Sequence, residues 1–341
     1  IIYYNMRFIW EDSMIAKRYS DVVQEKPLVL GTRGSLLALW QANHIKEKLE
    51  SLGFQVVLKT IKTKGDKILD APLAKIGGKG LFTKELENEL LSGGIDFAVH
   101  SLKDVPIAIP PELMLVSITQ REDARDCFVS EKYADIASLP QGAKVGTTSL
   151  RRSMQLKRIR QDLDTQSLRG NVQTRLEKLR KGEFDAIILA SAGLNRLDLK
   201  DDIGFISHLQ INQFIPAMGQ GSLGIECRDP KYSPDFRDQA IMKVLESLHD
   251  SKSALCCNIE RAFIQLLGGG CQSPIGIHAQ ILDSKEIEIQ CVVGSLDASK
   301  VLTETRVCNK GEVEYALQDM INTLKKNGVM EILEEVRTSL N

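Results

Sequence analysis

Residues 27–52, PLVLGTRGSLLALWQANHIKEKLESL, contain the pattern that decides the fold. The first part, Pro27 to Thr32, is a short apolar run that ends in Gly-Thr and predicts a buried strand. From Ser35 to Leu52 the apolar residues recur near helical spacing, which predicts an amphipathic helix, and Ser35 stands where an N-cap is expected. A strand that passes directly into such a helix is typical of an α/β fold.

The same unit returns in the middle of the chain. A strand at 144–147 runs into VGTTSLRR (145–152), and a helix is expected from Ser149 to Gln161. The pattern also predicts strands at 54–61, 95–100, 166–168 and 184–190 and helices at 81–91 and 171–181. Strands that alternate with helices favour parallel sheets with right-handed crossovers. We therefore expect two similar α/β lobes, each binding ligands beyond the carboxyl ends of its strands.

A third unit is expected after residue 237, where the alternation ends. One helix is predicted from 237 to 267, followed by GGGCQSPIG (268–276), strands at 275–282, 286–293 and 301–307, and helices at 313–326 and 330–338. This pattern predicts a small α+β domain. With 341 residues the chain has room for two or three domains. The expected division is an N-terminal appendage of unknown role at 1–26, a first lobe at 27–124 joined by 214–236, a second lobe at 125–213 and a C-terminal domain at 237–341.

The composition argues against several classes of protein. Lys and Arg number 44 and Asp and Glu 45, and the net charge of −1 is unlike that of a general nucleic-acid binder. No apolar run approaches the ~18 residues that indicate a membrane span. Seven cysteines without a CxxC pair predict a reducing compartment, and the scattered histidines predict no transition metal. We expect the protein to be cytoplasmic. Because of the N-terminal appendage, location in an organelle is not excluded.

Arginines stand where predicted strands end and helices begin. They are Arg33, Arg151, Arg152, Arg169, Arg175 and Arg196. Helix N-termini carry positive potential, and arginine makes bidentate hydrogen bonds with carboxylates and phosphates. A single arginine of this kind is most simply interpreted as solvated helix surface. Their gathering at one edge of the sheets favours a polyanionic ligand.

Two further motifs contain reactive side chains. In AVHSLKDVP (98–106), Asp104 follows a predicted strand beside Lys103. A carboxylate there can act as a general acid or base or stabilise a developing cation, and an ordinary turn before proline is the other interpretation. In LGGGCQSP (267–274), glycines place Cys271 in a loop, where a thiolate can react. No histidine adjoins Cys271, which argues against a papain-like protease.

Nine sequence blocks together resemble one known family. In chain order they are GTRGSLLALWQA, KTKGDKIL, GGKGLFTKELE, DFAVHSLKDVP, VGTTSLRR, LRGNVQTRLEKL, AIILASAGLNRL, MGQGSLGIECR and LGGGCQSPIG. On these blocks the chain, from about residue 27 to 341, is similar to the porphobilinogen deaminases, also called hydroxymethylbilane synthases. The resemblance implies three domains, of which the first two are like periplasmic binding proteins. This agrees with the two lobes predicted above.

The resemblance also implies an activity and a cofactor. Enzymes of this family are transferases of tetrapyrrole (heme) biosynthesis that join four porphobilinogen molecules head to tail, with loss of ammonia, into linear hydroxymethylbilane. A dipyrromethane cofactor made from substrate primes the chain and is attached through a thioether to the cysteine of GGGC, here Cys271. The catalytic aspartate of the family lies in HSLKD, here Asp104. Its carboxylate can stabilise the electron-poor azafulvene that remains when ammonia leaves.

Binding residues are implied by the same motifs. The cofactor is expected to contact Ser101, Lys103, Asp104, Ser149, Arg151 and Arg152. The substrate, with its acetate and propionate groups, is expected to contact Arg33, Ser35, Lys79, Phe82, Arg169, Arg175 and Arg196. Lys79 and Phe82 lie at the end of the long Gly- and Lys-rich connection 62–80, which we expect to cover the cleft. We expect porphobilinogen as the partner, no nucleic acid, membrane or metal, and a monomer.

Two other functions fit parts of the pattern. A non-catalytic anion-binding protein of the periplasmic type explains the lobes and the arginines, but it gives no reason for GGGC or for a third domain. An enzyme that uses Cys271 as a transient acyl nucleophile lacks a histidine partner. A stable polypyrrole adduct, measured as added mass on the intact protein, distinguishes the deaminase from both.

Overall fold

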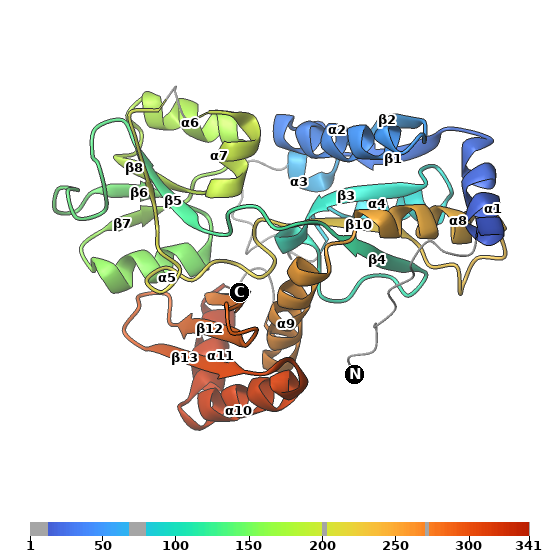
Figure 1. The fold of residues 1–341 in the computed structure, drawn as a ribbon. Helices are drawn as coiled ribbons and strands as arrows, with labels where there is room; N and C mark the ends of the chain where they lie inside the picture. Colours follow the sequence, from blue (N-terminus) through green and yellow to red (C-terminus); the bar gives the residue numbers. More distant parts are fainter. Residues whose placement is uncertain (1–12, 68–79, 200–202, 270–272, 341) are drawn as a thin grey trace.

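The structure is a computed structural model that describes residues 13–67, 80–199, 203–269 and 273–340. It contains both α/β lobes and the C-terminal unit expected from the sequence, each built on a β-sheet (Figure 1). Two sheets have five strands and the other has three. In Figure 1 the first lobe (blue and cyan) and the second lobe (green) lie side by side, with the C-terminal unit (orange to red) below them.

The sheet of the first lobe has the strand order β2-β1-β3-β10-β4. Its strands are β1 (Leu28–Thr32), β2 (Val56–Thr60), β3 (Phe97–Ser101), β4 (Leu113–Ile118) and β10 (Leu223–Arg228). β1 runs parallel to β2 and β3, whereas β10 runs antiparallel to β3 and β4. The sheet is therefore mixed, and the prediction of a parallel sheet is wrong for β10.

The second lobe repeats this arrangement with the order β7-β6-β8-β5-β9. Its strands are β5 (Asp126–Ser130), β6 (Lys144–Gly146), β7 (Asp164–Gln166), β8 (Ala186–Ala190) and β9 (Phe205–His208). β6 is parallel to β7 and β8, and β5 is antiparallel to β8 and β9. The chain crosses between the lobes twice, from β4 to β5 and from β9 to β10. The strand that follows each crossing, β5 or β10, is antiparallel to its neighbour from the alternating strand–helix units, β8 or β3.

The predicted strand–helix units begin as the sequence indicates. α2 (Leu36–Ser51) follows β1 and α5 (Leu150–Ile159) follows β6. The Ser35 hydroxyl accepts from the Ala38 amide at 3.3 Å, and the Ser149 hydroxyl accepts from the Arg152 amide at 3.4 Å, which confirms both N-caps. The other helices of the lobes are α3 (Lys64–Lys67), α4 (Lys84–Leu91), α6 (Val172–Arg180) and α7 (Ser191–Leu197). α2 of the first lobe contacts α7 of the second (Figure 1).

The helix predicted from 237 to 267 is two helices with different partners. α8 (Phe236–Leu245) packs on the first lobe, where Leu245 shares a core with Leu30. α9 (Ser251–Leu267) packs on the C-terminal sheet and begins at Asp250, whose carboxylate accepts from the Ser253 amide at 2.8 Å. The prediction of one helix is wrong because this N-cap starts a new helix. From this packing we propose that the C-terminal domain begins near residue 250 rather than at 237.

The described part of the N-terminal appendage forms α1 (Ser13–Gln24), which packs against α8. Tyr19 stacks on Phe236 with 5.4 Å between ring centroids, and Val23 is buried. The Arg237 side chain donates to the Val22 carbonyl at 2.8 Å. These contacts attach α1 to the first lobe on the side away from the second lobe (Figure 1).

The C-terminal domain is an antiparallel sheet covered by helices. Its strands are β11 (Ile275–Ile281), β12 (Ile287–Gly294) and β13 (Val301–Cys308), and α9, α10 (Val313–Lys326) and α11 (Val329–Leu340) accompany them. Phe263, Ile289 and Met320 are fully buried in its core. Across the described ranges of the chain, no helix combines the length and the apolar character that crossing a membrane requires.

Candidate active site

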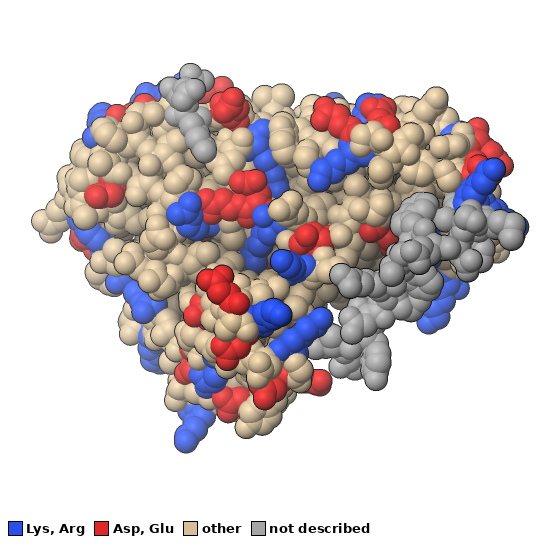
Figure 2. All heavy atoms as spheres, viewed as in Figure 1, with Lys and Arg blue, Asp and Glu red and all other residues tan. Residues whose placement is uncertain are grey.

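A cleft of about 2000 Å³ opens where the two lobes and the C-terminal domain meet. It lies beyond the carboxyl ends of β1 and β3 in the first lobe, beside the N-terminal turns of α5 and α6 in the second, and against α11 of the C-terminal domain. Lys and Arg side chains gather at the centre of the face, where these parts meet (Figure 2). This is where the ligands of open α/β sheets bind.

Every predicted site residue that the structure describes lines this cleft. They are Arg33, Ser35, Phe82, Ser101, Lys103, Asp104, Ser149, Arg151, Arg152, Arg169, Arg175 and Arg196. Lys79 and Cys271 lie outside the described residues. The fold thus gathers motifs from both lobes at one site, and the role of each residue stays a prediction.

Arg33 is held from two sides. Its guanidinium donates to the Asp66 carboxylate, with Nε 3.3 Å from Oδ2, and it stacks over the Phe82 ring at 4.1 Å from the centroid. Asp66 also accepts from the Thr63 hydroxyl at 2.7 Å. Asp66 and Phe82 lie near the two ends of the 62–80 connection. The described ends of that connection therefore shape the wall of the cleft around Arg33.

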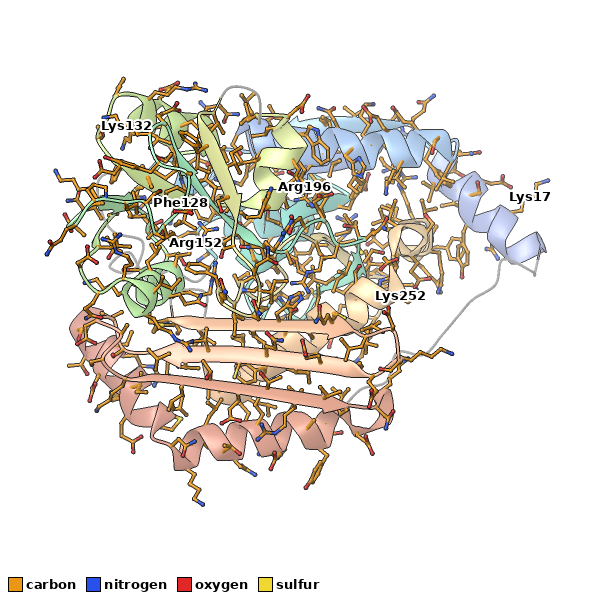
Figure 3. All side chains as sticks on the ribbon, turned by 60° about the vertical axis from the view of Figure 1, so that its left-hand side comes forward. Lys17, Phe128, Lys132, Arg152, Arg196 and Lys252 are labelled. Atoms are coloured by element: carbon orange, nitrogen blue, oxygen red, sulfur yellow. The ribbon has the colours of Figure 1, made fainter. Side chains whose placement is uncertain are left out.

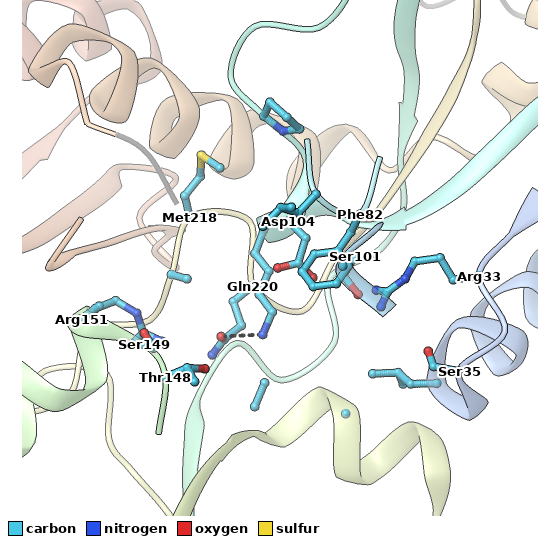
Figure 4. A pocket seen from close by; sticks show the side chains of 18 of the residues that line it. Arg33, Ser35, Phe82, Ser101, Asp104, Thr148, Ser149, Arg151, Met218 and Gln220 are labelled. Carbon is cyan, nitrogen blue, oxygen red and sulfur yellow. Dashed lines mark hydrogen bonds between the residues drawn. The ribbon is translucent and has the colours of Figure 1, made fainter. Parts of the chain in front are cut away.

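Asp104 lies in the single turn (Leu102–Asp104) that follows β3. Its side chain is exposed in the cleft, and within the described ranges it makes no side-chain hydrogen bond or ion pair. Figure 4 shows it beside Ser101 and Phe82, between Arg33 on one side and Arg151 on the other. A carboxylate in this position can contact a ligand without giving up a structural bond.

Lys103 is more enclosed than its neighbour. Its ammonium donates to Gln220 Oε1 at 3.3 Å (dashed in Figure 4). Burial and the nearby charge of Arg152 lower the pKa of Lys103 to about 8, although the negative charges of Asp104 and Asp126 oppose this. Because this pKa lies near neutrality, pH can change the charge of Lys103 under ordinary assay conditions.

Arg151 and Arg152 are buried in the cleft wall and paired with a carboxylate that the sequence analysis did not identify. Asp126 accepts from Arg151 Nη1 at 2.6 Å and from Arg152 Nη2 and Nε at 2.6 and 3.0 Å. Burial by itself raises the pKa of Asp126, but the charges of both arginines outweigh it and hold the pKa well below its usual range. One carboxylate therefore serves two cations, which leaves a net positive charge in the wall.

Two other arginines are fixed by backbone carbonyls. Arg175 donates to the Gly170 carbonyl at 2.9 Å and Arg196 to the Gly221 carbonyl at 2.6 Å. Burial lowers the pKa of each to about 10, and both guanidinium groups stay charged at neutral pH. In Figure 3, Arg152 and Arg196 lie near the middle of the molecule, away from Lys17 and Lys132. A neutral carbonyl leaves the charge of an arginine uncompensated, so it can bind an anion.

The residues on either side of the 270–272 gap line the cleft. They are Gly269 and Ser273, and Cys271 lies between them in the sequence. The six other cysteines are buried. Burial raises the pKa of Cys257 to about 12, so its thiol is a poor nucleophile. Within the ranges that the structure describes, no group of three or more His, Cys, Asp and Glu side chains is placed to hold a metal ion.

Sequence reasoning missed three residues that shape the cleft: Asp66, Asp126 and Gln220. Gln220 stands between Gly219 and Gly221, whose φ angles are 66° and 98°, so the GQG of the MGQGSLGIECR block was the available signal. Asp126 begins a buried apolar strand, and a charge in that place signals a buried partner. Asp66 gives no such signal, because Arg33 is 33 positions away.

The chain is similar to proteins of one known family. Two family models match the chain. The model described as "Porphobilinogen deaminase, dipyromethane cofactor binding domain" matches residues 28–233, and the model described as "Porphobilinogen deaminase, C-terminal domain" matches residues 254–326. The porphobilinogen deaminase of Helicobacter hepaticus is 58% identical, over 82% of this chain and 85% of that protein. Those of Helicobacter acinonychis and Campylobacter curvus are 51% and 52% identical, over 91% and 93% of this chain and 98% and 99% of those proteins.

Solved structures are more distant. The periplasmic VFT2 domain of Bordetella pertussis BvgS has a TM-score of 0.40 and 13% identity, over 70% of this chain and 95% of that chain. A likeness this weak adds nothing to the arrangement described above. The two family matches, in contrast, span most of the chain, and the relatives named above are 51–58% identical to it over 85–99% of their own length. The chain therefore belongs to the porphobilinogen deaminase family.

Proposed function

We propose that this protein catalyses the reaction of its family, the head-to-tail joining of four porphobilinogen molecules into hydroxymethylbilane with loss of ammonia. The observation that carries this proposal is the cleft, in which arginines of both lobes surround the exposed carboxylate of Asp104. Arginine suits a substrate with acetate and propionate groups. A carboxylate suits a reaction in which positive charge develops on the substrate.

Each addition breaks a C–N bond and forms a C–C bond. The aminomethyl nitrogen of porphobilinogen takes up a proton and leaves as ammonia, and the methylene left behind is an electron-poor azafulvene. The α-carbon of another pyrrole attacks this methylene and then loses its hydrogen as a proton. Asp104 is the group that we expect to stabilise the positive charge near the pyrrole N–H and to carry protons between these steps. Its oxygens make no bond to the described protein that would compete with this role.

The residues of the cleft fit a dipyrromethane cofactor. Its carboxylates match the net positive charge that remains around Asp126, and the chain on both sides of Cys271 lines the cleft. When bound, the cofactor supplies the pyrrole carbon that makes the first attack. We propose that Cys271 holds it through a thioether. The residues proposed to contact its rings and carboxylates are Ser101, Lys103, Asp104, Ser149, Arg151 and Arg152.

The substrate and the growing chain need more room than one small ligand. The cleft volume of about 2000 Å³ exceeds the ~300–1,000 Å³ of ordinary small-molecule pockets. We propose that the pyrrole carboxylates and rings bind Arg33, Ser35, Lys79, Phe82, Arg169, Arg175 and Arg196. Ser35 uses its oxygen as the acceptor of an N-cap, and its hydroxyl hydrogen can still be donated to a ligand.

We also propose that the protein acts as a monomer in the cytoplasm and needs neither a metal ion nor nucleic acid. Light scattering on the purified protein checks the first point, since a mass well above 37.9 kDa would contradict it. Activity that survives a chelating agent is expected if no metal takes part.

The mass of the intact protein tests the proposed function. We expect the purified protein to carry two linked pyrrole units, and peptide mapping to place them on Cys271. Cys271→Ser should lack the added mass and release no ammonia from porphobilinogen, because serine is a far poorer nucleophile than a thiolate. Cys308→Ser, in the same domain, is the matched control and should keep both. A protein that binds porphobilinogen but carries no adduct and releases no ammonia would instead be the anion-binding alternative.

A further inference from the structure

We infer that Asp126 is a positioning residue for the cleft. Its buried carboxylate fixes the direction of Arg151 and Arg152, and through Gln220 it sets where Lys103 stands beside Asp104. The inference rests on the proposed function and adds to it a residue that contacts neither substrate nor cofactor.

The first step is the set of bonds around Asp126. Its side chain is fully buried and accepts four hydrogen bonds. Arg151 Nη1 donates to Oδ2 at 2.6 Å, while Oδ1 accepts from Arg152 Nη2 at 2.6 Å, from Arg152 Nε at 3.0 Å and from Gln220 Nε2 at 3.0 Å. A carboxylate bound this often has one orientation, and so do the two guanidinium groups bonded to it.

Asp126 and its partners come from three separate segments of the chain. Asp126 begins β5, directly after the chain has crossed from the first lobe to the second. Gln220 lies in the returning segment between β9 and β10, and the two arginines lie in the first turn of α5. The carbonyl of Ile215, also in the returning segment, accepts from Arg151 at 2.8 Å. One buried carboxylate thus ties both crossings between the lobes to the helix turn that lines the cleft.

The bonds around Asp126 leave hydrogen-bond donors of Arg151 and a net positive charge available to a ligand. Arg151 uses only Nη1 toward Asp126 and Ile215, so within the described ranges its Nε and Nη2 groups have no hydrogen-bond partner. Two guanidinium groups around one carboxylate keep a net positive charge. An arginine that is held in one direction by its counter-ion loses little conformational freedom when a ligand carboxylate arrives. Asp126 therefore prepares the wall for an anion rather than merely neutralising it.

The fourth step connects this wall to the reacting residues. Gln220 donates to Asp126 and accepts from the Lys103 ammonium at 3.3 Å. Its backbone is fixed by neighbours with positive φ: a Cβ on Gly221 would lie 2.4 Å from the Glu122 carbonyl oxygen, so only glycine fits there. Gln220 is consequently a rigid bridge between Asp126 and Lys103, the residue that precedes Asp104.

A pair of Asp→Asn variants tests the inference. Asp126→Asn removes the charge shared by Arg151 and Arg152. The matched control is Asp238→Asn in the first lobe, because Asp238 is also buried and accepts from Arg228 at 2.7 to 3.0 Å but does not line the cleft. Each protein is purified as it is expressed. The measurements are the fraction that carries the two-pyrrole mass, the melting temperature and the pH dependence of kcat with porphobilinogen.

We expect both variants to melt at a lower temperature but only Asp126→Asn to lose cofactor mass. In the fraction that keeps it, kcat should fall by up to about 10²-fold, as for a misplacement of about 1 Å. The alkaline limb of its pH profile should also move to lower pH, because the charge of Asp126 favours protonated Lys103. The other charges that act on Lys103, from Arg151, Arg152 and Asp104, are unchanged.

The outcomes separate positioning from stability. If Asp126→Asn melts lower but keeps full cofactor mass, wild-type kcat and the wild-type alkaline limb, Asp126 is only structural and the inference is overturned. If it does not fold, Gln220→Met decides, because this change leaves the charges and the Asp126–arginine bonds in place. Gln220→Met should load cofactor normally, but its kcat should be lower and the alkaline limb of its pH profile should lie at lower pH. Wild-type values of both would contradict the role of Gln220 as a bridge between Asp126 and Lys103. A wild-type protein that releases no ammonia would reject the proposed function itself.

Discussion

Asp104→Asn should slow turnover strongly and leave the stability of the protein nearly unchanged. Because the Asp104 side chain is exposed and has no partner within the described ranges, the substitution removes no buried contact. The free energy of unfolding should change by less than about 0.5 kcal/mol, as for an ordinary surface substitution. Turnover should fall by ~10²–10⁴, the usual contribution of a general acid or base. That loss corresponds to about 3–5 kcal/mol in activation free energy.

The assay is single-turnover ammonia release from cofactor-loaded protein, together with thermal unfolding of the same samples. Asp104→Glu keeps the charge but moves it by one methylene, and a displacement of about 1 Å can cost ~10²-fold, so this variant should be slow but faster than Asn. Asp283→Asn is the matched control, because Asp283 is exposed and lies outside the cleft. Wild-type ammonia release by Asp104→Asn would refute the reasoning, and Asp104 would then be an ordinary turn residue.

Three further predictions follow from the cleft wall. Arg152→Leu leaves Asp126 with only one arginine, and the free energy of unfolding should fall by ~3–5 kcal/mol in denaturant titration; a loss under ~1 kcal/mol contradicts the pairing. Turnover should decline as pH rises through about 8, where Lys103 loses its proton, and Lys103→Arg should move this decline to higher pH. Gly221→Ala, with φ 98°, should cost ~1–3 kcal/mol in thermal unfolding. Gly311→Ala, where nothing lies within 4 Å of the added Cβ, should be nearly neutral.

Local pattern predicted most of the alternating elements, because periodicity and N-caps depend on residues within a few turns of each other. The helix after Ser35 and the helix after Ser149 are where the sequence indicates. β10 and β5 were not assigned as antiparallel strands, since their pairing joins distant segments, such as Gly224 with His100. The break before α9 was missed although Asp250 is a local N-cap signal, and the structure adds that the two helices pack against different partners.

By itself the sequence determined the motifs, their order and the chemistry they imply: arginines at strand ends, a carboxylate beside Lys103 and a cysteine among glycines. These are local signals, and each residue type limits what it can bind. Only the tertiary structure decided which arginines already have a counter-ion. Asp126 meets Arg151 and Arg152 about 25 positions away, and it meets Gln220 across 94 positions. Periodicity and motifs cannot predict such a contact. A buried charge needs an oppositely charged partner, and the fold supplies that partner from residues that are distant in the sequence.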